Sequence, residues 1–448
     1  METQRRSTNG GPLSPSVGYF PSERGSTLGK SIVAFSLTLA FVGSLPAQTS
    51  QSDFADRLSK NRYQLAVENG RLTGDGVPVL KSALEDAQFV MVGEDHGIAQ
   101  IPPFYAGLCD ILGPAGFHIM AIETGPLAAA ELEKWVRQAD GWKQLAAFER
   151  QYPASIAFYN WSEEYDLLSH CAGTATGGPF HIWGLDQELM GSPRLLLTRI
   201  LEQHPGPDAA REGQRLLKKN DDAHAAAAKS GSPGDTFMFA ASDQELRHFR
   251  DLLRQEGNAV SRSLIDALIE SREIYQKNMN GSGFDSNRQR ALLMKHTFFS
   301  DYRGAEQPDT KAPKVMFKFG AWHMFKGINP LHNSDLGNFV TELADGQGTR
   351  SVHIMILAVQ GTQLRFAGIG RPFHPTPFNL AEDKDSDFLY LKPMFAAVQG
   401  DGMTMFDLRA LRKGFSSLGT IDKEVERLIF GYDLLVLVPK ATPSRGVD

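Results

Sequence analysis

Two apolar runs of the chain end in the same way, at a glycine that is followed three residues later by a histidine. Phe89–Val92 leads into Gly93-Glu94-Asp95-His96, and the mainly apolar run Val315–Phe319 leads into Gly320-Ala321-Trp322-His323. Each run predicts a buried β-strand, and the glycine lets the backbone turn off that strand. Both strands therefore present polar side chains at one edge of a sheet, where ligands bind in α/β folds.

The segment after the first run predicts a strand–helix–strand unit. Residues 99–115 have apolar side chains at helical spacing, at Phe104, Leu108, Ile111 and Leu112. Phe117–Ile122 then forms a second, mainly apolar strand. Because a crossover helix makes the two strands parallel, both end at the same edge of the sheet. We therefore expect Glu94 and His96 to lie near Glu123, which directly follows the second strand.

Similar patterns predict the remaining elements. The expected strands are residues 180–186, 314–319, 351–359 and 433–438, and the expected helical stretches are residues 54–68, 127–174 and 285–302. About six strands that alternate with helices define the α/β class, with a central, mostly parallel sheet flanked by helices.

Residues 193–280 differ in character from the rest of the chain. They are polar, alanine-rich and helix-periodic, and prolines and glycines interrupt them. This pattern predicts a helical insertion after the third strand, placed as a lid or wall covering the site. The expected organisation is a targeting segment, residues 1–47, followed by a single α/β domain, residues 48–448, that contains the insertion.

The first 47 residues have the features of a secretory signal peptide. Four basic residues precede the apolar stretch Ser31–Leu45, and a small residue, Ala47, comes before a polar segment. The apolar core is shorter than the roughly 20 residues that a membrane-spanning helix needs. A retained membrane anchor is the alternative. We expect a periplasmic or secreted protein that meets a membrane only through this segment.

Composition and charge exclude some classes of protein. The 448 residues have a formal net charge of −6 and no long basic run, so we expect no nucleic-acid partner. Cys109 and Cys171 lie in apolar, helix-like contexts, which favours two buried free side chains; a disulfide in an oxidising compartment is the alternative. The chain has no Cys-x-x-Cys pair, which excludes a zinc knuckle.

A histidine placed between carboxylates is the main chemical feature of the sequence. Glu94 lies in the same turn as His96, and Glu123 lies across the sheet edge. Negative charge beside an imidazole stabilises its protonated form and holds its tautomer, so His96 is a candidate general base. The alternative is that His96 only hydrogen-bonds loop backbone. Glu123 is either exposed at the mouth of a site or buried in a pair.

Other strand ends add candidate residues. Asp186 follows the third strand and is either a site carboxylate or the N-cap of the next helix. His323 repeats the pattern of His96, and Trp322 and Phe325 are candidate walls for an apolar substrate. Three other histidines lie inside predicted strands, and we assign them to the core or the solvent face: His118, His181 and His353.

The order of these motifs resembles the erythromycin esterase-like superfamily. That group also takes in the haem-binding iron-regulated lipoproteins and the Tiki/TraB proteases, but the erythromycin esterase branch is the nearer match. The resemblance covers about residues 80–444 and rests on Gly93–Gly97, Ile122–Thr124, Trp183–Asp186, Asn287–Met294, Gly320–His323 and Tyr432–Ser444.

The resemblance implies hydrolysis of a small-molecule ester or lactone by activated water. The catalytic residues it implies are Glu94, His96, Glu123, Arg290 and His323. His96 would take a proton from water, and Arg290 with His323 would stabilise the oxyanion. The candidate substrate contacts are Asp186, Arg288, Trp322 and Phe325. The chain has no Gly-x-Ser-x-Gly elbow, which argues against a serine acyl-enzyme.

Two alternatives use the same residues. His96, Glu123 and His323 suit zinc or manganese, and a metal-bound hydroxide would then attack an ester or an amide, as in a metal-dependent hydrolase or peptidase. The other alternative is a secreted haem- or iron-binding protein without enzymatic activity. Ester hydrolysis by His96 and the glutamates requires no cofactor.

Overall fold

The computed structural model describes residues 49–446 except 177, 307–311, 369–372 and 419–420. The predicted targeting segment, residues 1–47, lies outside the described residues. Among the described residues, no helix is both long and apolar enough to span a membrane.

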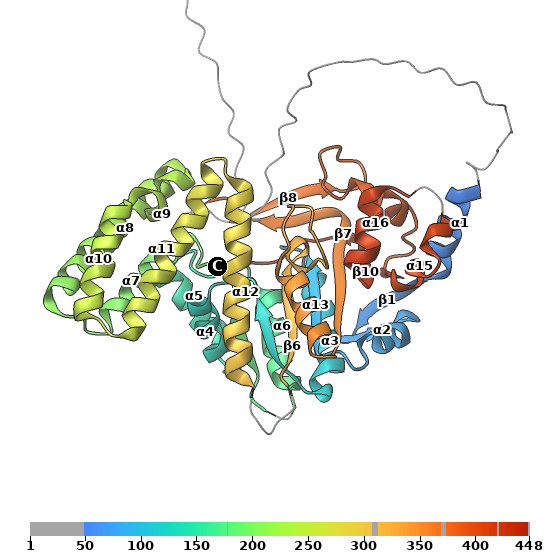
Figure 1. Cartoon of the computed structure of the whole chain (residues 1–448), viewed down its shortest axis with the longest axis horizontal. Coiled ribbons are helices and arrows are strands. Elements are labelled where there is room, and N and C mark those ends of the chain that lie inside the picture. The colour runs from blue at the N-terminus through green and yellow to red at the C-terminus, as the bar shows by residue number, and fades with distance from the viewer. Residues whose placement is uncertain (1–48, 177, 307–311, 369–372, 419–420, 447–448) are drawn as a thin grey trace, which may run out of the picture.

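One sheet runs through the described residues (Figure 1). Its spatial order is β2-β1-β9-β10-β7-β3-β6-β4-β5, and β8 pairs with β7 outside this path. The six strands from β10 to β5 in this order are parallel to one another. Strands β1, β2, β8 and β9 make only antiparallel pairs. The strands are β1 Arg62–Glu68, β2 Arg71–Thr73, β3 Phe89–Glu94, β4 Phe117–Ile122, β5 His181–Gly184, β6 Lys314–Gly320, β7 Ser351–Arg365, β8 His374–Asn379, β9 Met403–Asp407 and β10 Leu434–Ala441.

Helices cover both faces of this sheet (Figure 1). The expected α/β class with a mostly parallel sheet is confirmed. The helices are α1 Thr49–Lys60, α2 Gly76–Leu84, α3 Ile101–Leu112, α4 Pro126–Trp135, α5 Gly141–Gln151, α6 Ser162–Thr174, α7 Pro193–Leu201, α8 Pro207–Ser230, α9 Phe237–Ala240, α10 Asp243–Glu256, α11 Ala259–Met279, α12 Gly283–Ala305, α13 Leu336–Gly346, α14 Lys392–Ala396, α15 Arg409–Arg412 and α16 Lys423–Gly431.

Alternate residues of the central strands point into two separate cores. Val90 and Val92 of β3 pack on the side of α3, α4 and α6, which we call the α3 face. Phe89 and Met91 pack on the side of α12, α13 and α16, which we call the α13 face. The two-residue period of a strand produces this division, and it explains why the central strands are apolar at nearly every position.

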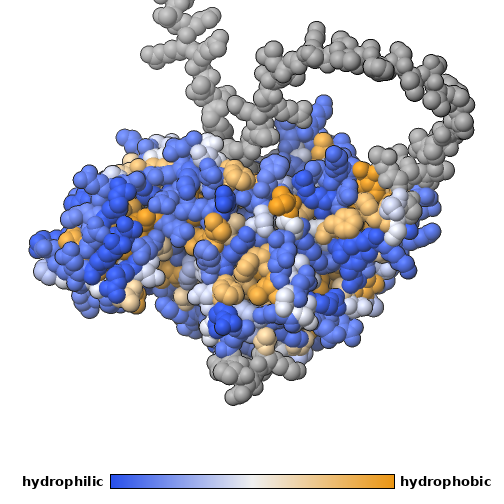
Figure 2. Space-filling model, viewed as in Figure 1, coloured by the Kyte–Doolittle hydropathy of each residue, from blue (hydrophilic) through white to orange (hydrophobic). Residues whose placement is uncertain are grey.

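Helices α7 to α11 form a separate bundle beside the sheet, at the left of Figure 1. Leu216, Phe249 and Leu268 belong to a core of this bundle that is distinct from the two sheet cores. In Figure 2 the bundle presents a mostly hydrophilic surface, as expected for helices that turn their apolar stripes inward. The bundle touches the sheet edge where the Glu188 N–H donates to Ser271 Oγ on α11 at 3.0 Å.

The prediction of a helix over residues 54–68 is wrong in its second half. Helix α1 ends at Lys60, and Arg62–Glu68 is strand β1, which pairs with β2 and β9. Asn69 and Gly70 form the tight turn between β1 and β2, with φ values of 51° and 75°. An Asn-Gly pair between short strands is a strong hairpin signal, because both positions of a type I′ turn need a positive φ.

The described residues contain ten strands rather than about six. The four that were not predicted, β1, β2, β8 and β9, make the antiparallel pairs at the margins of the sheet. These four strands are short or half-exposed, so they lack the continuous apolar run that marks a central parallel strand.

The expectation of two free cysteines is also wrong. Cys109 on α3 and Cys171 on α6 form a disulfide, with their Cα atoms 5.3 Å apart. The two helices pack against each other on the α3 face, and this packing brings together residues that are 62 positions apart. Sequence spacing alone cannot establish such a distance.

Candidate active site

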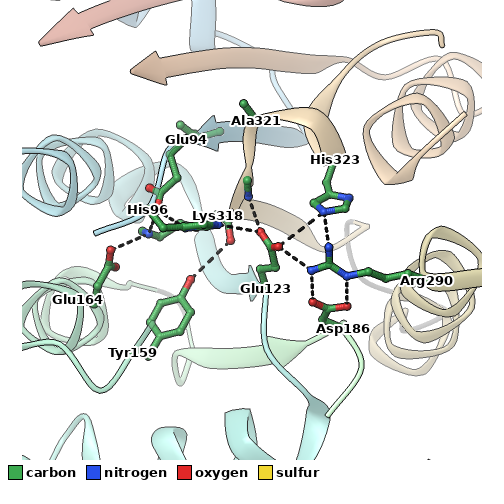
Figure 3. A network of polar contacts seen from close by, with 12 residues as sticks. Glu94, His96, Glu123, Tyr159, Glu164, Asp186, Arg290, Lys318, Ala321 and His323 are labelled. Carbon is green, nitrogen blue, oxygen red and sulfur yellow. Dashed lines mark hydrogen bonds and ion pairs between the residues drawn. The ribbon is translucent and has the colours of Figure 1, made fainter. Parts of the chain in front are cut away.

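The candidate residues come together because four neighbouring strands end at one edge. In the order β3-β6-β4-β5, these strand ends present Glu94, Gly320, Glu123 and Asp186. Figure 3 shows the three acidic residues of this group. Strands β3 and β4 are parallel, as expected, but β6 lies between them. The predicted meeting of Glu94, His96 and Glu123 occurs, and β6 adds its own residues to the middle of the group.

Close packing at both strand ends leaves little room for a side chain, and it requires glycine at Gly93. A Cβ atom on Gly93 would lie 2.8 Å from the Ala321 Cα atom, so only glycine allows β3 and the residues after β6 to approach this closely. A Cβ atom on Gly320 would lie 3.2 Å from Glu123 Oε2 and 3.3 Å from His96 Nε2. Neither glycine has a positive φ, so its role is space rather than a special turn.

His96 contacts a carboxylate through each of its ring nitrogens. Its Nδ1 atom lies 2.9 Å from Glu94 Oε1, and its Nε2 atom lies 3.3 Å from Glu123 Oε2. Phe158 stacks on the imidazole, with ring centroids 3.8 Å apart and planes inclined by 15°. The side chain is 12% exposed, so two carboxylates and one aromatic face hold the ring at the end of a mostly buried site.

The charges around His96 favour its protonated form. Burial opposes a charge on the imidazole, but the carboxylates of Glu123 and Glu94 outweigh burial and raise the pKa of His96 to about 10. Burial likewise opposes ionisation of Glu123, but His323, Arg290 and His96 hold its pKa well below the ordinary value. The resting arrangement is therefore an imidazolium between two carboxylates.

Arg290 on α12 joins three strand ends. Its guanidinium pairs with Asp186 in a two-pronged contact, in which Nε donates to Oδ1 at 2.8 Å and Nη2 donates to Oδ2. Nη2 also donates to Glu123 Oε1 at 2.6 Å, and Nη1 lies 2.8 Å from His323 Nε2 (Figure 3). Asp186 is thus a site carboxylate, and it does not cap a helix, because α7 begins only at Pro193. All three nitrogens of Arg290 hold protein groups in place.

His323 is oriented by a residue that sequence reasoning missed. Asp335, the N-cap of α13, is buried and lies 3.0 Å from His323 Nδ1. Because an arginine can only donate, the Arg290 contact requires a lone pair on Nε2, so Nδ1–H donates to Asp335. Burial opposes a charge on His323, but Asp335 outweighs it and raises the pKa of the imidazole. Protonation of Nε2 would therefore break the bond to Arg290.

Lys318 is a second missed residue, and it lies deep beneath His96. It shares the α3 face with Met316, whereas its neighbours Phe317 and Phe319 point to the α13 face. Its Nζ atom lies 2.5 Å from Glu94 Oε1 and 2.9 Å from Glu164 Oε1 on α6. The side chain is 1% exposed. A lysine inside an otherwise apolar strand was the available signal, because buried lysines are almost always paired.

The environment of Lys318 explains how three charges are held without water. The ammonium group lies 5.0 Å from the ring centroid of Tyr105 and 5.5 Å from that of Tyr159, so aromatic faces add to its stabilisation. Burial disfavours the charge, but Glu164 and Glu94 outweigh burial and raise the pKa of Lys318. Burial raises the pKa of Glu164 to about 7, although Lys318 opposes that rise.

Three predicted substrate contacts lie elsewhere. Trp322 and Phe325 are buried in the core of the α13 face, where Trp322 stacks on Phe388 at 4.6 Å, so they support the fold and do not wall a site. Arg288 is exposed. It precedes Arg290 by two residues, and a helix rotates about 200° over two residues, so the two arginines point in nearly opposite directions.

The predicted metal ligands do not fit a metal ion. Among the described residues, no group of three or more histidine, cysteine, aspartate or glutamate side chains is arranged to hold one. Glu123 accepts hydrogen bonds from Arg290 and from the Gly320 N–H, and both nitrogens of His323 already have partners. A cation would have to displace Arg290, so the residues present do not fit a metal ion.

Solved structures share the fold of this chain. A histidine-to-asparagine mutant of the erythromycin esterase EreC, in its open conformation, superposes with a TM-score of 0.59 at 17% identity over 86% of this chain and 99% of that one. A succinoglycan biosynthesis protein gives 0.54 at 16% identity over 89% and 100%. A Bacillus cereus protein gives 0.54 at 14% identity over 88% and 99%.

At these identities the likeness shows a common fold. No family model matches the chain, and no curated protein matches it by sequence. Fold and site together define the class: an α/β protein that has a buried carboxylate–histidine–arginine network at the ends of its parallel strands. More particularly, the fold is the one seen in erythromycin esterase EreC.

We expect His96 to stay protonated far above the ordinary histidine range in the ligand-free protein. Histidine resonances followed by NMR should show one imidazole that titrates near pH 10. The pKa of His96 is higher in the folded protein than in the unfolded chain. The stability that protonated His96 contributes is therefore complete below about pH 6.5 and is lost as the pH rises through about 10. His353, whose pKa burial lowers to about 3, should stay neutral throughout and serves as the internal reference. A His96 titration near pH 6.5 would contradict the ion-pair geometry.

Proposed function

We propose that this protein is a hydrolase that cleaves an ester or lactone with water activated by His96 and Glu123. The observation that carries the proposal is the contact of both ring nitrogens of His96 with strand-end carboxylates, at 2.9 and 3.3 Å. The arrangement lies at the carboxyl edge of a parallel sheet, where α/β proteins bind ligands. The fold shared with an esterase supports the same class of reaction.

The proposed chemistry uses His96 in two steps. Its deprotonated Nε2 takes a proton from water, and the water oxygen attacks the carbonyl carbon of the ester. The bond from that carbon to the alkoxy oxygen then breaks, and His96 returns the proton to the leaving alkoxide. The products are a carboxylic acid and an alcohol, so atoms and charge balance. Glu94 orients Nδ1–H, and Glu123 aligns the water.

Arg290 and His323 have a different role from the one expected from the sequence. We expected both to stabilise the oxyanion. Because the guanidinium is bonded to Asp186, Glu123 and His323, Arg290 acts by fixing Glu123 in place. His323 fixes Arg290 in turn, through the Asp335 contact on its other side. We therefore treat them as positioning residues of the proposed reaction.

The test is a panel of esters and lactones incubated with the purified protein. We expect hydrolysis of at least one class, and we expect it to survive exhaustive chelation, because no step uses a metal. Activity that is lost on chelation and restored by zinc or manganese would replace this proposal with the metal-dependent one. A protein that hydrolyses nothing in the panel but gives a Soret band with haem would favour the binding protein.

We also propose that the protein is exported to the periplasm or secreted. The signal-peptide pattern of residues 1–47 supports export. The Cys109–Cys171 disulfide supports it independently, because disulfides persist in oxidising compartments and are rare in the cytosol. Titration of thiols in the denatured, unreduced protein tests this proposal. Two free thiols would show that the disulfide is absent and would remove its support for export.

A further inference from the structure

A small pocket lies beside His96, and several aromatic side chains contribute to its walls. Asp95 and His96 line it together with Phe158, Trp161, Phe366 and Phe373, and small, aliphatic and polar residues complete the lining. None of these aromatic residues was singled out as a substrate contact from the sequence. The pocket adjoins the reactive imidazole directly, because Phe158 stacks on the His96 ring.

The aromatic walls hold one another in place. Trp161 packs edge to face on Phe158 and on Phe373, at 5.6 Å in both cases. Phe366 packs against Phe373 at 6.0 Å. Offset and edge-to-face pairs of this kind stabilise a fixed arrangement of rings. Enlarging the pocket would break several of these contacts together, so its size is set by the walls.

The volume of the pocket limits what it can hold. It encloses about 40 Å³. An apolar cavity that binds benzene measures about 150 Å³. The pocket is therefore much smaller than a cavity that holds an aromatic ring, and it suits a small group better than a ring or a long chain.

Two hydrogen-bond donors of the lining have no partner. The indole Nε1 of Trp161 and the Nε of Arg365 are buried and make no hydrogen bond to any described residue. Trp161 is only 3% exposed, so water does not satisfy its N–H at the surface. A buried donor without a partner is destabilising, and an acceptor on a ligand would offset that cost. A carbonyl oxygen is such an acceptor, and the positive charge of Arg365 would favour it further.

We propose that this pocket binds the short acyl group of the substrate, so that the protein hydrolyses acetyl esters in preference to esters of longer acids. The inference rests on the proposed hydrolase function. The methyl group lies among Phe158, Trp161 and Phe373, and the carbonyl oxygen accepts hydrogen bonds from Trp161 Nε1 and Arg365 Nε. Water attacks the carbonyl carbon from the His96 side, and acetate and an alcohol are released.

The test compares 4-nitrophenyl acetate, butyrate and hexanoate. We expect kcat/KM for the acetate to exceed that for the hexanoate by at least about tenfold, since two or more extra methylenes have no room. Phe373→Ala should enlarge the pocket and raise the hexanoate-to-acetate ratio at least about tenfold. Phe430→Ala, at a phenylalanine that is 46% exposed and does not line the pocket, is the matched control and should leave the ratio unchanged. Equal rates with all three esters, or an unchanged ratio in Phe373→Ala, would overturn the inference.

A binding measurement separates this inference from the proposed function. Acetate should change the tryptophan fluorescence of the wild type and not that of Trp161→Phe, whereas hexanoate should cause no change in either. A fluorescence response to acetate without hydrolysis of any ester would support the short-acyl pocket and contradict the proposed hydrolase function. Hydrolysis together with equal fluorescence responses to acetate and hexanoate would reject the short-acyl pocket and keep the hydrolase.

Discussion

Replacing His96 with asparagine is expected to lower kcat/KM for ester hydrolysis by at least about 100-fold, the usual scale for the loss of a general base. Asparagine can still hydrogen-bond Glu94, but it cannot take up a proton. Glu123→Gln should cause a comparable loss, because the neutral amide would align the attacking water less well. His181→Asn, at a half-exposed histidine that bonds Glu133 on α4, is the matched control and should retain the full rate.

The proposed role of His96 as a base also predicts the direction in which kcat/KM changes with pH. The raised pKa of His96 leaves the base form scarce at neutral pH. We therefore expect kcat/KM of the wild type to rise about tenfold per pH unit and to level off near pH 10. The profile should be absent from the residual activity of His96→Asn. A wild-type rate that falls as the pH rises from about 6 to about 9 would mean that the imidazolium acts as an acid, and it would contradict the base role.

Replacing Lys318 with methionine is expected to destabilise the fold by about 3–5 kcal/mol, the usual cost of removing one partner from a buried ion pair. Methionine fills a similar space but leaves Glu164 without its cationic partner and Glu94 with only His96, at positions that are 2% and 1% exposed. Urea unfolding followed by circular dichroism measures the loss. Lys314→Met is the matched control, since Lys314 begins the same strand but is only half-buried and lies over Phe117.

The pH dependence of the Lys318→Met variant tests the cause. Without the ammonium group, burial raises the pKa of Glu164 further, so the folded state binds a proton there more readily than the unfolded chain does. Stability of the variant relative to the wild type should therefore recover as the pH falls from about 8 towards about 5. Adding Glu164→Gln should restore part of the stability lost at the higher pH. A deficit that is independent of pH and unaffected by Glu164→Gln would point to lost packing alone.

The strand–helix–strand unit that contains the first motif could be predicted from the sequence. The mainly apolar run before Glu123 and the helical spacing within residues 99–115 are local features, and β3, α3 and β4 follow them closely. The crossover connection then made β3 and β4 parallel, and this was sufficient to bring Glu94, His96 and Glu123 to one edge. Strand β1, which lies between β2 and β9, escaped prediction, because its residues were assigned to the end of a helix.

The partners of these residues depend on contacts between distant segments. Lys318 meets Glu94 across 224 positions of the chain, and Arg290 meets Asp186 across 104. No local pattern specifies either pair, because each exists only once β6 has entered the sheet between β3 and β4 and α12 has packed over the strand ends. The burial of Trp322 and Phe325 also depends on contacts between distant segments, because both side chains pack into the core on the α13 face of the sheet.

The sequence by itself therefore determined the α/β class, the strand ends and the main carboxylate–histidine cluster, since these follow from periodicity and handedness along short stretches. Only the tertiary structure decided the charge state of that cluster and the shape of the pocket beside it. Charge state depends on which buried groups lie within a few ångströms, and pocket shape depends on how Phe158, Trp161 and Phe373 pack. Both are properties of long-range packing, which a single sequence does not display.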